Sequence, residues 1–178
     1  MLDDTPTHQD RLKRNGSPAG LSGILQLKEA EGEGKEASCK AFGYLRGIED
    51  KAQALELRFQ SGDSMWFPYG WLGTWQYSRS AGLLLKFSGD VVYLVLIRGS
   101  NLDRPLTDES INLTRAGLQR HRVLWLREMT PDEIQQVGDT GPTIHSIEVA
   151  QFESQAALRE WLAEKAPAFL HGSGQALR

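Results

Sequence analysis

Hydrophobic and polar residues alternate along short segments in the middle of the chain. In residues 54–60 every second residue is leucine or phenylalanine, and residues 83–88 continue the same period of two. Residues 91–97 form an uninterrupted apolar run. A period of two is typical of a strand with one buried face, and a short apolar run is typical of a strand covered on both faces. We therefore expect a β-sheet core in which 91–97 is covered by a helix, a closed barrel or another subunit.

Turn and cap residues delimit further elements. A Ser-Gly-Asp turn predicts that residues 64–67 pair back on the first strand as a hairpin, which Pro68 ends because it has no N–H for the ladder. Residues 130–133 (Thr-Pro-Asp-Glu) carry the residues of a capping box with proline at the first position, so a helix begins there. Residues 154–165 have one apolar stripe and are followed by Pro167, which predicts the longest helix.

Weaker patterns give the remaining elements and the domain limits. We expect a helical turn at 69–73, a helix within 107–120, and strands at 24–27, 123–129 and 144–149. The polar N-terminal region has no hydrophobic period, so residues 1–40 are expected to be a disordered or loosely packed tail and linker. Residues 41–167 then form a single β-rich domain, and 168–178 form a second tail. The predicted fold class is α+β: a small antiparallel β core with a C-terminal helix, for which a partly closed SH3- or Sm-like barrel is one candidate form.

Composition agrees with a soluble domain of ordinary type. The chain has 178 residues, of which 40% are hydrophobic and 24% charged, and that length suits one domain. No apolar run approaches the roughly 20 residues of a spanning helix, so we expect no membrane partner. A single cysteine, Cys39, excludes an intramolecular disulfide and favours a cytoplasmic location.

Charge is distributed unevenly along the chain. The formal net charge of −3 argues against a strongly basic nucleic-acid binder. Arg120 and Arg122 nevertheless flank His121, and Arg127 follows closely. This positive patch can hold a phosphate or a nucleic-acid backbone, or it can serve as a charged edge that prevents strands of different molecules from pairing. We favour the second interpretation.

Tryptophans are concentrated between the predicted strands at 54–60 and 83–88. Trp66, Trp71 and Trp75 lie within ten residues, and the last two share a face if 69–75 is helical. Exposed aromatic side chains stack on bases, sugars or peptides, whereas buried ones fill a core. Core packing is the favoured interpretation, with Trp71 and Trp75 kept as candidate binding residues.

Patterns of catalytic or metal-binding residues are weak. The four histidines are scattered, and there is no Cys-x-x-Cys pair. The Gly-Glu-Gly segment at 32–34 follows no convincing strand, so it fails as a phosphate loop. We expect no metal, no cofactor and no catalytic residue, and an enzyme is the third hypothesis only.

Two resemblances to known families can be stated. The apolar strand that ends in Arg98-Gly99-Ser100-Asn101-Leu102 resembles the second motif of the Sm-like RNA-binding proteins, whereas their first motif is not matched. In that family the Arg and Gly lie at a tight loop and the Arg helps to bind a base in a ring pore, which implies such a role for Arg98. The segments 43–47, 55–58, 98–102 and 120–128 together resemble a family of uncharacterised bacterial proteins, and that resemblance implies no activity.

These observations lead to one main hypothesis and two alternatives. The main hypothesis is a non-catalytic interaction or adaptor domain with a protein partner or self-association, and no small-molecule ligand is inferred. The first alternative is an Sm-like RNA-binding module, and the second is an unrecognised enzyme. The candidate binding residues are Trp71, Trp75, Arg98, Gly99, Asn101, Arg120 and Arg122.

Overall fold

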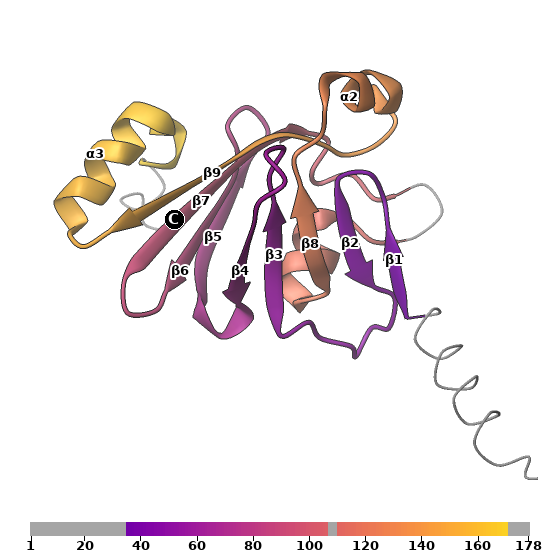
Figure 1. Cartoon of the computed structure of the whole chain (residues 1–178), viewed down its shortest axis with the longest axis horizontal. Coiled ribbons are helices and arrows are strands. Elements are labelled where there is room, and N and C mark those ends of the chain that lie inside the picture. Colours follow the sequence, from indigo (N-terminus) through magenta and orange to yellow (C-terminus); the bar gives the residue numbers. More distant parts are fainter. Residues whose placement is uncertain (1–34, 107–109, 171–178) are drawn as a thin grey trace, which may run out of the picture. The chain divides into compact units, whose positions relative to one another are not determined.

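The computed structural model describes residues 35–106 and 110–170, whose strands form two sheets (Figure 1). The five-stranded sheet has the order β1-β2-β8-β3-β4 and consists of β1 (Glu36–Ser38), β2 (Phe42–Leu45), β8 (Val123–Arg127), β3 (Ala54–Arg58) and β4 (Ser64–Pro68). The four-stranded sheet has the order β5-β6-β7-β9 and consists of β5 (Leu72–Ser78), β6 (Gly82–Ser88), β7 (Val92–Ser100) and β9 (Thr143–Phe152).

The helical segments are short. They are the α-helices α2 (Pro131–Val137) and α3 (Gln155–Lys165), the 3₁₀ segments η1 (Tyr69–Trp71), η3 (Leu118–Arg120) and η4 (Pro167–Phe169), and the π-helical turn η2 (Leu113–Gly117). The predicted α+β class is therefore confirmed. The suggested barrel is not found, because the described strands form two open sheets rather than a closed one.

Strand β8 lies between two strands that are neighbours in the sequence. It pairs antiparallel with β2 and parallel with β3, so the five-stranded sheet is mixed. All pairs of the four-stranded sheet are antiparallel. The connection from β2 to β3 must consequently pass the start of β8.

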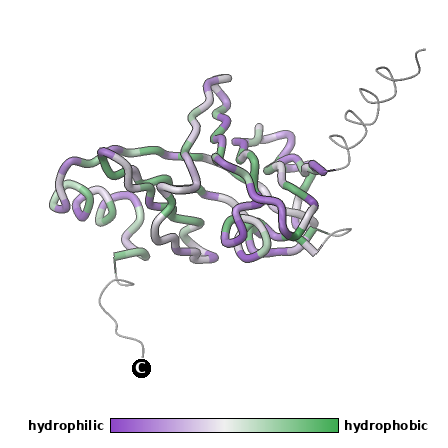
Figure 2. Tube along the Cα trace, turned by 90° about the horizontal axis from the view of Figure 1, so that it is seen from below, coloured by the Kyte–Doolittle hydropathy of each residue, from purple (hydrophilic) through white to green (hydrophobic). Residues whose placement is uncertain are grey.

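One core joins the two sheets. The inner residues of the hairpin β3–β4 and those of β6 and β7 belong to the same buried cluster, in which Phe67 stacks on Phe87 with ring centroids 4.5 Å apart. The alternation of hydrophobic and hydrophilic positions along the strands is visible in Figure 2. Burial of these faces is the main favourable contribution to folding.

A second, smaller core lies on the opposite face of the four-stranded sheet. Leu94 and Leu96 of β7 face Leu158 and Leu162 of α3, while Val95 and Ile97 face the main core. The apolar strand predicted at 91–97 is therefore covered on both faces, and a helix supplies the second cover. Trp161 is half-buried and meets the Phe152 ring edge-on at 5.8 Å.

Several sequence predictions agree with the structure. The hairpin at 54–67, the strands near 83–88 and 123–129, the helical turn at 69 and the helix at 154–165 are all present. Strands β7 and β9 are longer than predicted, since they pair from Val92 to Ser100. The strand at 24–27 and most of the predicted N-terminal tail lie outside the described residues.

Other predictions were wrong or incomplete. The chain enters β5 directly after η1, so Trp75 lies on a strand and shares no helical face with Trp71. In place of the helix expected within 107–120, the described part forms η2 and η3; residues 107–109 lie outside the described chain. Strand β1 begins before the predicted domain start at 41, and Phe169, beyond the predicted end at 167, is buried in the second core.

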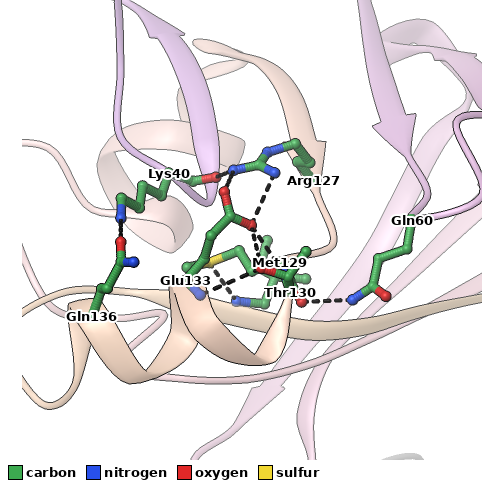
Figure 3. A network of polar contacts seen from close by, with 8 residues as sticks. Lys40, Gln60, Arg127, Met129, Thr130, Glu133 and Gln136 are labelled. Atoms are coloured by element: carbon green, nitrogen blue, oxygen red, sulfur yellow. Dashed lines mark hydrogen bonds and ion pairs between the residues drawn. The ribbon is translucent and has the colours of Figure 1, made fainter.

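Helix α2 is held to the five-stranded sheet by a polar network (Figure 3). The Arg127 guanidinium donates to both carboxylate oxygens of Glu133, at 2.8 and 3.1 Å, and to the Lys40 carbonyl at 2.9 Å. Glu133 also accepts from the Thr130 N–H at 2.9 Å, which completes the predicted capping box. These contacts, led by the hydrogen bond from Arg127, lower the pKa of Glu133 from 4.5 to about 2.

The first prediction follows from this lowered pKa. Because the folded state favours the ionised carboxylate, Glu133 stabilises the protein above pH 4.5, and this stabilisation is lost as the pH falls from there towards about 2. Glu133→Gln should thus lower the urea unfolding midpoint at neutral pH, with a difference from wild type that shrinks steadily on acidification. Asp132→Asn is the control, since the Asp132 side chain forms no ion pair with other described residues. An equal difference at all pH values would contradict the prediction.

Candidate functional site

The segment from 110 to 122 builds one wall of the candidate site. Asn112 caps the π-helical turn, since its Oδ1 accepts from the Ala116 N–H at 3.1 Å. Gly117 permits the tight path that follows, because a Cβ there would lie 2.8 Å from the Asn112 carbonyl oxygen. His121 ends the segment in the left-handed region, with φ of 55°, and its ring stacks on Tyr69. A π-helical turn is rare and is found frequently at functional sites.

The connection from β2 to β3 builds the opposite wall. Backbone hydrogen bonds tie it to the start of β8: Leu45 N–H donates to the Arg122 carbonyl at 2.8 Å, and Ala52 N–H donates to the His121 carbonyl at 2.7 Å. Arg46 and Ile48 lie on this connection and face the same cavity as the helical segment.

Between these walls lies an open cavity of about 770 Å³, here called the arginine basin. It is lined by Arg46, Ile48, Ser110, Ile111, Arg115, Ala116, Gln119, Arg120 and Arg122. Four guanidinium groups thus surround one cavity, and its described lining contains no carboxylate. Guanidinium groups remain protonated at any physiological pH and present planar donors that match phosphate and carboxylate oxygens.

Arg122 is the buried member of the basin, with only 7% of the residue exposed. Its Nε donates to the Leu45 carbonyl at 2.8 Å and its Nη2 to the Arg46 carbonyl at 2.6 Å. Both acceptors are neutral, and no ion pair with Arg122 is found among the described residues. A buried cation without a counter-ion favours an anion nearby, because an isolated charge is costly to bury.

A second cavity, here called the aromatic pocket, adjoins the basin. It measures about 450 Å³ and is lined by Trp75, Tyr77, Asp103, Asn112, Thr114 and Arg115. Arg115 lines both cavities, so they share one wall. The aromatic pocket therefore places two half-buried rings beside a cluster of guanidinium groups.

Hydrogen bonds and burial determine the protonation states of Tyr77 and Asp103 in the aromatic pocket. The Tyr77 hydroxyl donates to Asp103 Oδ1 at 3.0 Å, and Arg79 pairs with Oδ2 at 3.2 Å. Although partial burial opposes it, the hydrogen bonds from Tyr77 and Arg79 lower the pKa of Asp103. Burial, then the contact with Asp103, raises the pKa of Tyr77. At neutral pH the pocket therefore holds a neutral phenol and an ionised, accepting carboxylate.

A third cavity, here called the outer pocket, continues from the aromatic pocket through Tyr77 and Asp103. Its volume is about 620 Å³, and it is lined by Tyr77, Arg79, Ser100, Asn101, Asp103, Arg104, Pro105 and Asp139. Two arginines face two aspartates here, so the formal charges of its lining cancel. Asn101, in the left-handed region with φ of 57°, donates to the Gly141 carbonyl at 3.2 Å and fixes one wall.

The linked cavities bring together four of the residues selected from the sequence: Trp75, Asn101, Arg120 and Arg122. The other three lie elsewhere. Trp71 is 40% exposed and packs over Gly89. Arg98 donates to Glu148 at 3.3 Å and to the Lys165 carbonyl of α3 at 2.7 Å, so it ties α3 to the four-stranded sheet.

Gly99 is required by strand pairing rather than by a ligand. A register shift occurs between Arg98 and Gly99, and a Cβ on Gly99 would lie only 2.0 Å from the Thr143 carbonyl oxygen. Glycine is the one residue that lets β9 approach this closely.

The lining residues that sequence reasoning did not select include Arg46, Tyr77, Asp103, Asn112 and Arg115. The excess of arginine between 104 and 127 was a signal for Arg115. Nothing local indicated the others, because they come from separate segments of the chain that meet only in the folded structure.

Comparison of the chain with protein-family models, curated proteins and solved structures finds no match. Among the described residues no helix has the length and apolarity needed to cross a membrane. The same part of the chain contains no cluster of three or more His, Cys, Asp or Glu side chains with the geometry of a metal site.

The second prediction concerns the buried arginine. Arg122→Met removes a charged donor from two carbonyls and should lower the free energy of unfolding by about 2 kcal/mol. Arg120→Met is the matched control: its side chain is exposed and the change should stay below about 0.5 kcal/mol. Urea unfolding followed by tryptophan fluorescence measures both, and equal values for the two variants would show that Arg122 does not hold the β2–β3 connection.

Proposed function

We propose that this protein is a non-catalytic interaction domain that binds a phosphate-bearing partner in the arginine basin. The observation that carries the proposal is the gathering of four arginines around one cavity whose described lining has no acidic residue. Since a guanidinium group cannot accept a proton at neutral pH, such a lining is suited to hold and orient an anion rather than to transfer protons.

Preorganisation supports the same proposal. Arg122 is fixed by two carbonyls, and it fixes in turn the connection that carries Arg46. A site whose groups are already held in place loses less conformational freedom when a ligand binds. Arg115 and Arg120 are exposed and form no hydrogen bond or ion pair with the rest of the described chain, so their donors are available to a ligand.

The Sm-like alternative assigns the binding role to Arg98. In the structure this guanidinium already bonds Glu148 and the last turn of α3. That engagement favours an anchoring role, so we place the anion site at the basin and not at Arg98. The single cysteine supports a cytoplasmic location, which we propose with the same function.

The third prediction tests the basin directly. Inorganic pyrophosphate should bind to the full chain, measured by isothermal titration calorimetry at low ionic strength, and binding should weaken as salt is added. Arg120→Met should reduce the affinity by about tenfold or more, because it removes a charge-assisted contact.

Arg159→Met is the control for this experiment. Arg159 is an exposed arginine on α3, away from the basin lining, so this variant should bind as wild type does. Binding that is absent in wild type, or that is lowered equally by both substitutions, would contradict the proposed function.

The fourth prediction separates the two hypotheses about Arg98. Arg98→Ala removes the contacts with Glu148 and Lys165, so it should lower the free energy of unfolding by about 1 kcal/mol. It should leave pyrophosphate affinity unchanged. A loss of anion binding in a folded Arg98→Ala protein would instead favour the Sm-like interpretation.

A further inference from the structure

We propose that the phosphate-bearing partner is a guanosine di- or triphosphate, with its phosphates in the arginine basin and its base in the aromatic pocket. This inference rests on the proposed function and adds a base-binding subsite to it. The sequence alone led us to infer no small-molecule ligand.

The charge of the basin fits more than one phosphate. A phosphate group carries about two negative charges at neutral pH. Arg115, Arg120 and Arg122 alone supply three positive charges around one cavity, which exceeds what a single phosphate balances. A chain of two or three adjacent phosphates matches this arrangement better.

The position of the aromatic pocket fits a base attached to those phosphates. Arg115 lines both cavities, so a phosphate held in the basin beside this residue lies next to the pocket that contains Trp75 and Tyr77. Both rings are half-buried, so each is anchored by packing and still accessible. Aromatic side chains stack on any nucleobase, because every base has a flat π-face.

The polar groups of the pocket favour guanine over adenine. The ionised Asp103 has acceptor capacity beyond its bonds with Tyr77 and Arg79, since a carboxylate offers about four lone-pair sites. Asn112 uses its Oδ1 for Ala116 and Thr114, and its Nδ2 forms no hydrogen bond with another described residue. An acceptor and a donor in the lining of one pocket complement guanine, which presents N–H donors at N1 and N2 next to the O6 acceptor.

The neutral lining of the outer pocket disfavours binding of a longer polyanion such as a nucleic-acid strand. Its lining contains two arginines, Arg79 and Arg104, and two aspartates, Asp103 and Asp139, so the formal charge of the lining is zero. A nucleic-acid strand that continued past the base would meet no excess of positive charge there. A phosphoserine side chain, for its part, carries no ring that would stack in the aromatic pocket.

The experiment compares five ligands with the full chain by isothermal titration calorimetry: guanosine diphosphate, adenosine diphosphate, inorganic pyrophosphate, a single-stranded oligoribonucleotide and a phosphoserine peptide. We expect the affinity for guanosine diphosphate to be at least about fivefold higher than the affinity for pyrophosphate, because of base stacking. Guanosine diphosphate should bind about fivefold more tightly than adenosine diphosphate, because of one additional hydrogen bond.

The outcomes separate this inference from the proposed function. If pyrophosphate binds and both nucleotides bind no better, the phosphate site stands and the base subsite is overturned. Tighter binding of the oligoribonucleotide or the phosphopeptide than of guanosine diphosphate also overturns the inference. If none of the five ligands binds, both proposals fail.

Asp103→Asn tests the choice of base. It keeps the shape of the side chain and replaces part of its acceptor capacity with a donor, so the preference for guanosine over adenosine diphosphate should disappear while pyrophosphate still binds. An unchanged preference would contradict the assignment of Asp103.

Trp75→Phe tests the stacking and keeps a ring in the core. This variant should lose part of the advantage of guanosine diphosphate over pyrophosphate. Trp71→Phe is its control, because Trp71 is outside the linked cavities and should have no effect on either ligand. Equal effects of the two substitutions would overturn the role of Trp75.

Discussion

The insertion of β8 between β2 and β3 is the constraint on which the candidate site depends. Because β2 and β3 are consecutive in the sequence, their connection has to cross the start of β8, the strand that separates them. Arg122, the residue just before β8, holds this crossing through two carbonyls. The basin is the space left between the crossing and the helical segment that leads into β8. Topology, the buried cation and the cavity are therefore parts of a single arrangement.

The two sheets share one core but differ in how their other faces and margins are covered. The central strands of the four-stranded sheet, β6 and β7, are buried on both faces, by the shared core on one side and α3 on the other. The five-stranded sheet carries the crossing connection and α2 at its margins. Polar contacts are concentrated at those margins, as in the Arg127–Glu133 pair, while the centre of each sheet is held by apolar packing.

Local signals explain what could be predicted from the sequence. The alternation in β3, the apolar run of β7 and the capping box of α2 are encoded within a few residues, and the structure contains each of them. The mistaken helical face of Trp71 and Trp75 came from applying a helical period to residues that enter a strand.

The site could be predicted only in part, because its residues meet through long-range pairing. Arg120 and Arg122 were recognisable from charge alone, whereas Arg46 and Tyr77 had no local signal. Burial of Arg122 was also unexpected, since arginine is rarely buried without a counter-ion. The motif around Arg98 illustrates the opposite error: an Arg-Gly pair at a strand end serves here to anchor α3 and to admit a close neighbouring strand.

The parallel pairing of β3 with β8 has a consequence for the order of folding. The β3–β4 hairpin and the β5–β6–β7 meander join neighbours in the chain and can form early during synthesis, whereas β3 and β2 must wait for β8 before the five-stranded sheet is complete. Contacts between distant segments form slowly because a long loop must close first. A nascent chain that ended before Arg122 would thus have much of its four-stranded sheet but no basin. The basin is therefore completed late, together with the mixed sheet.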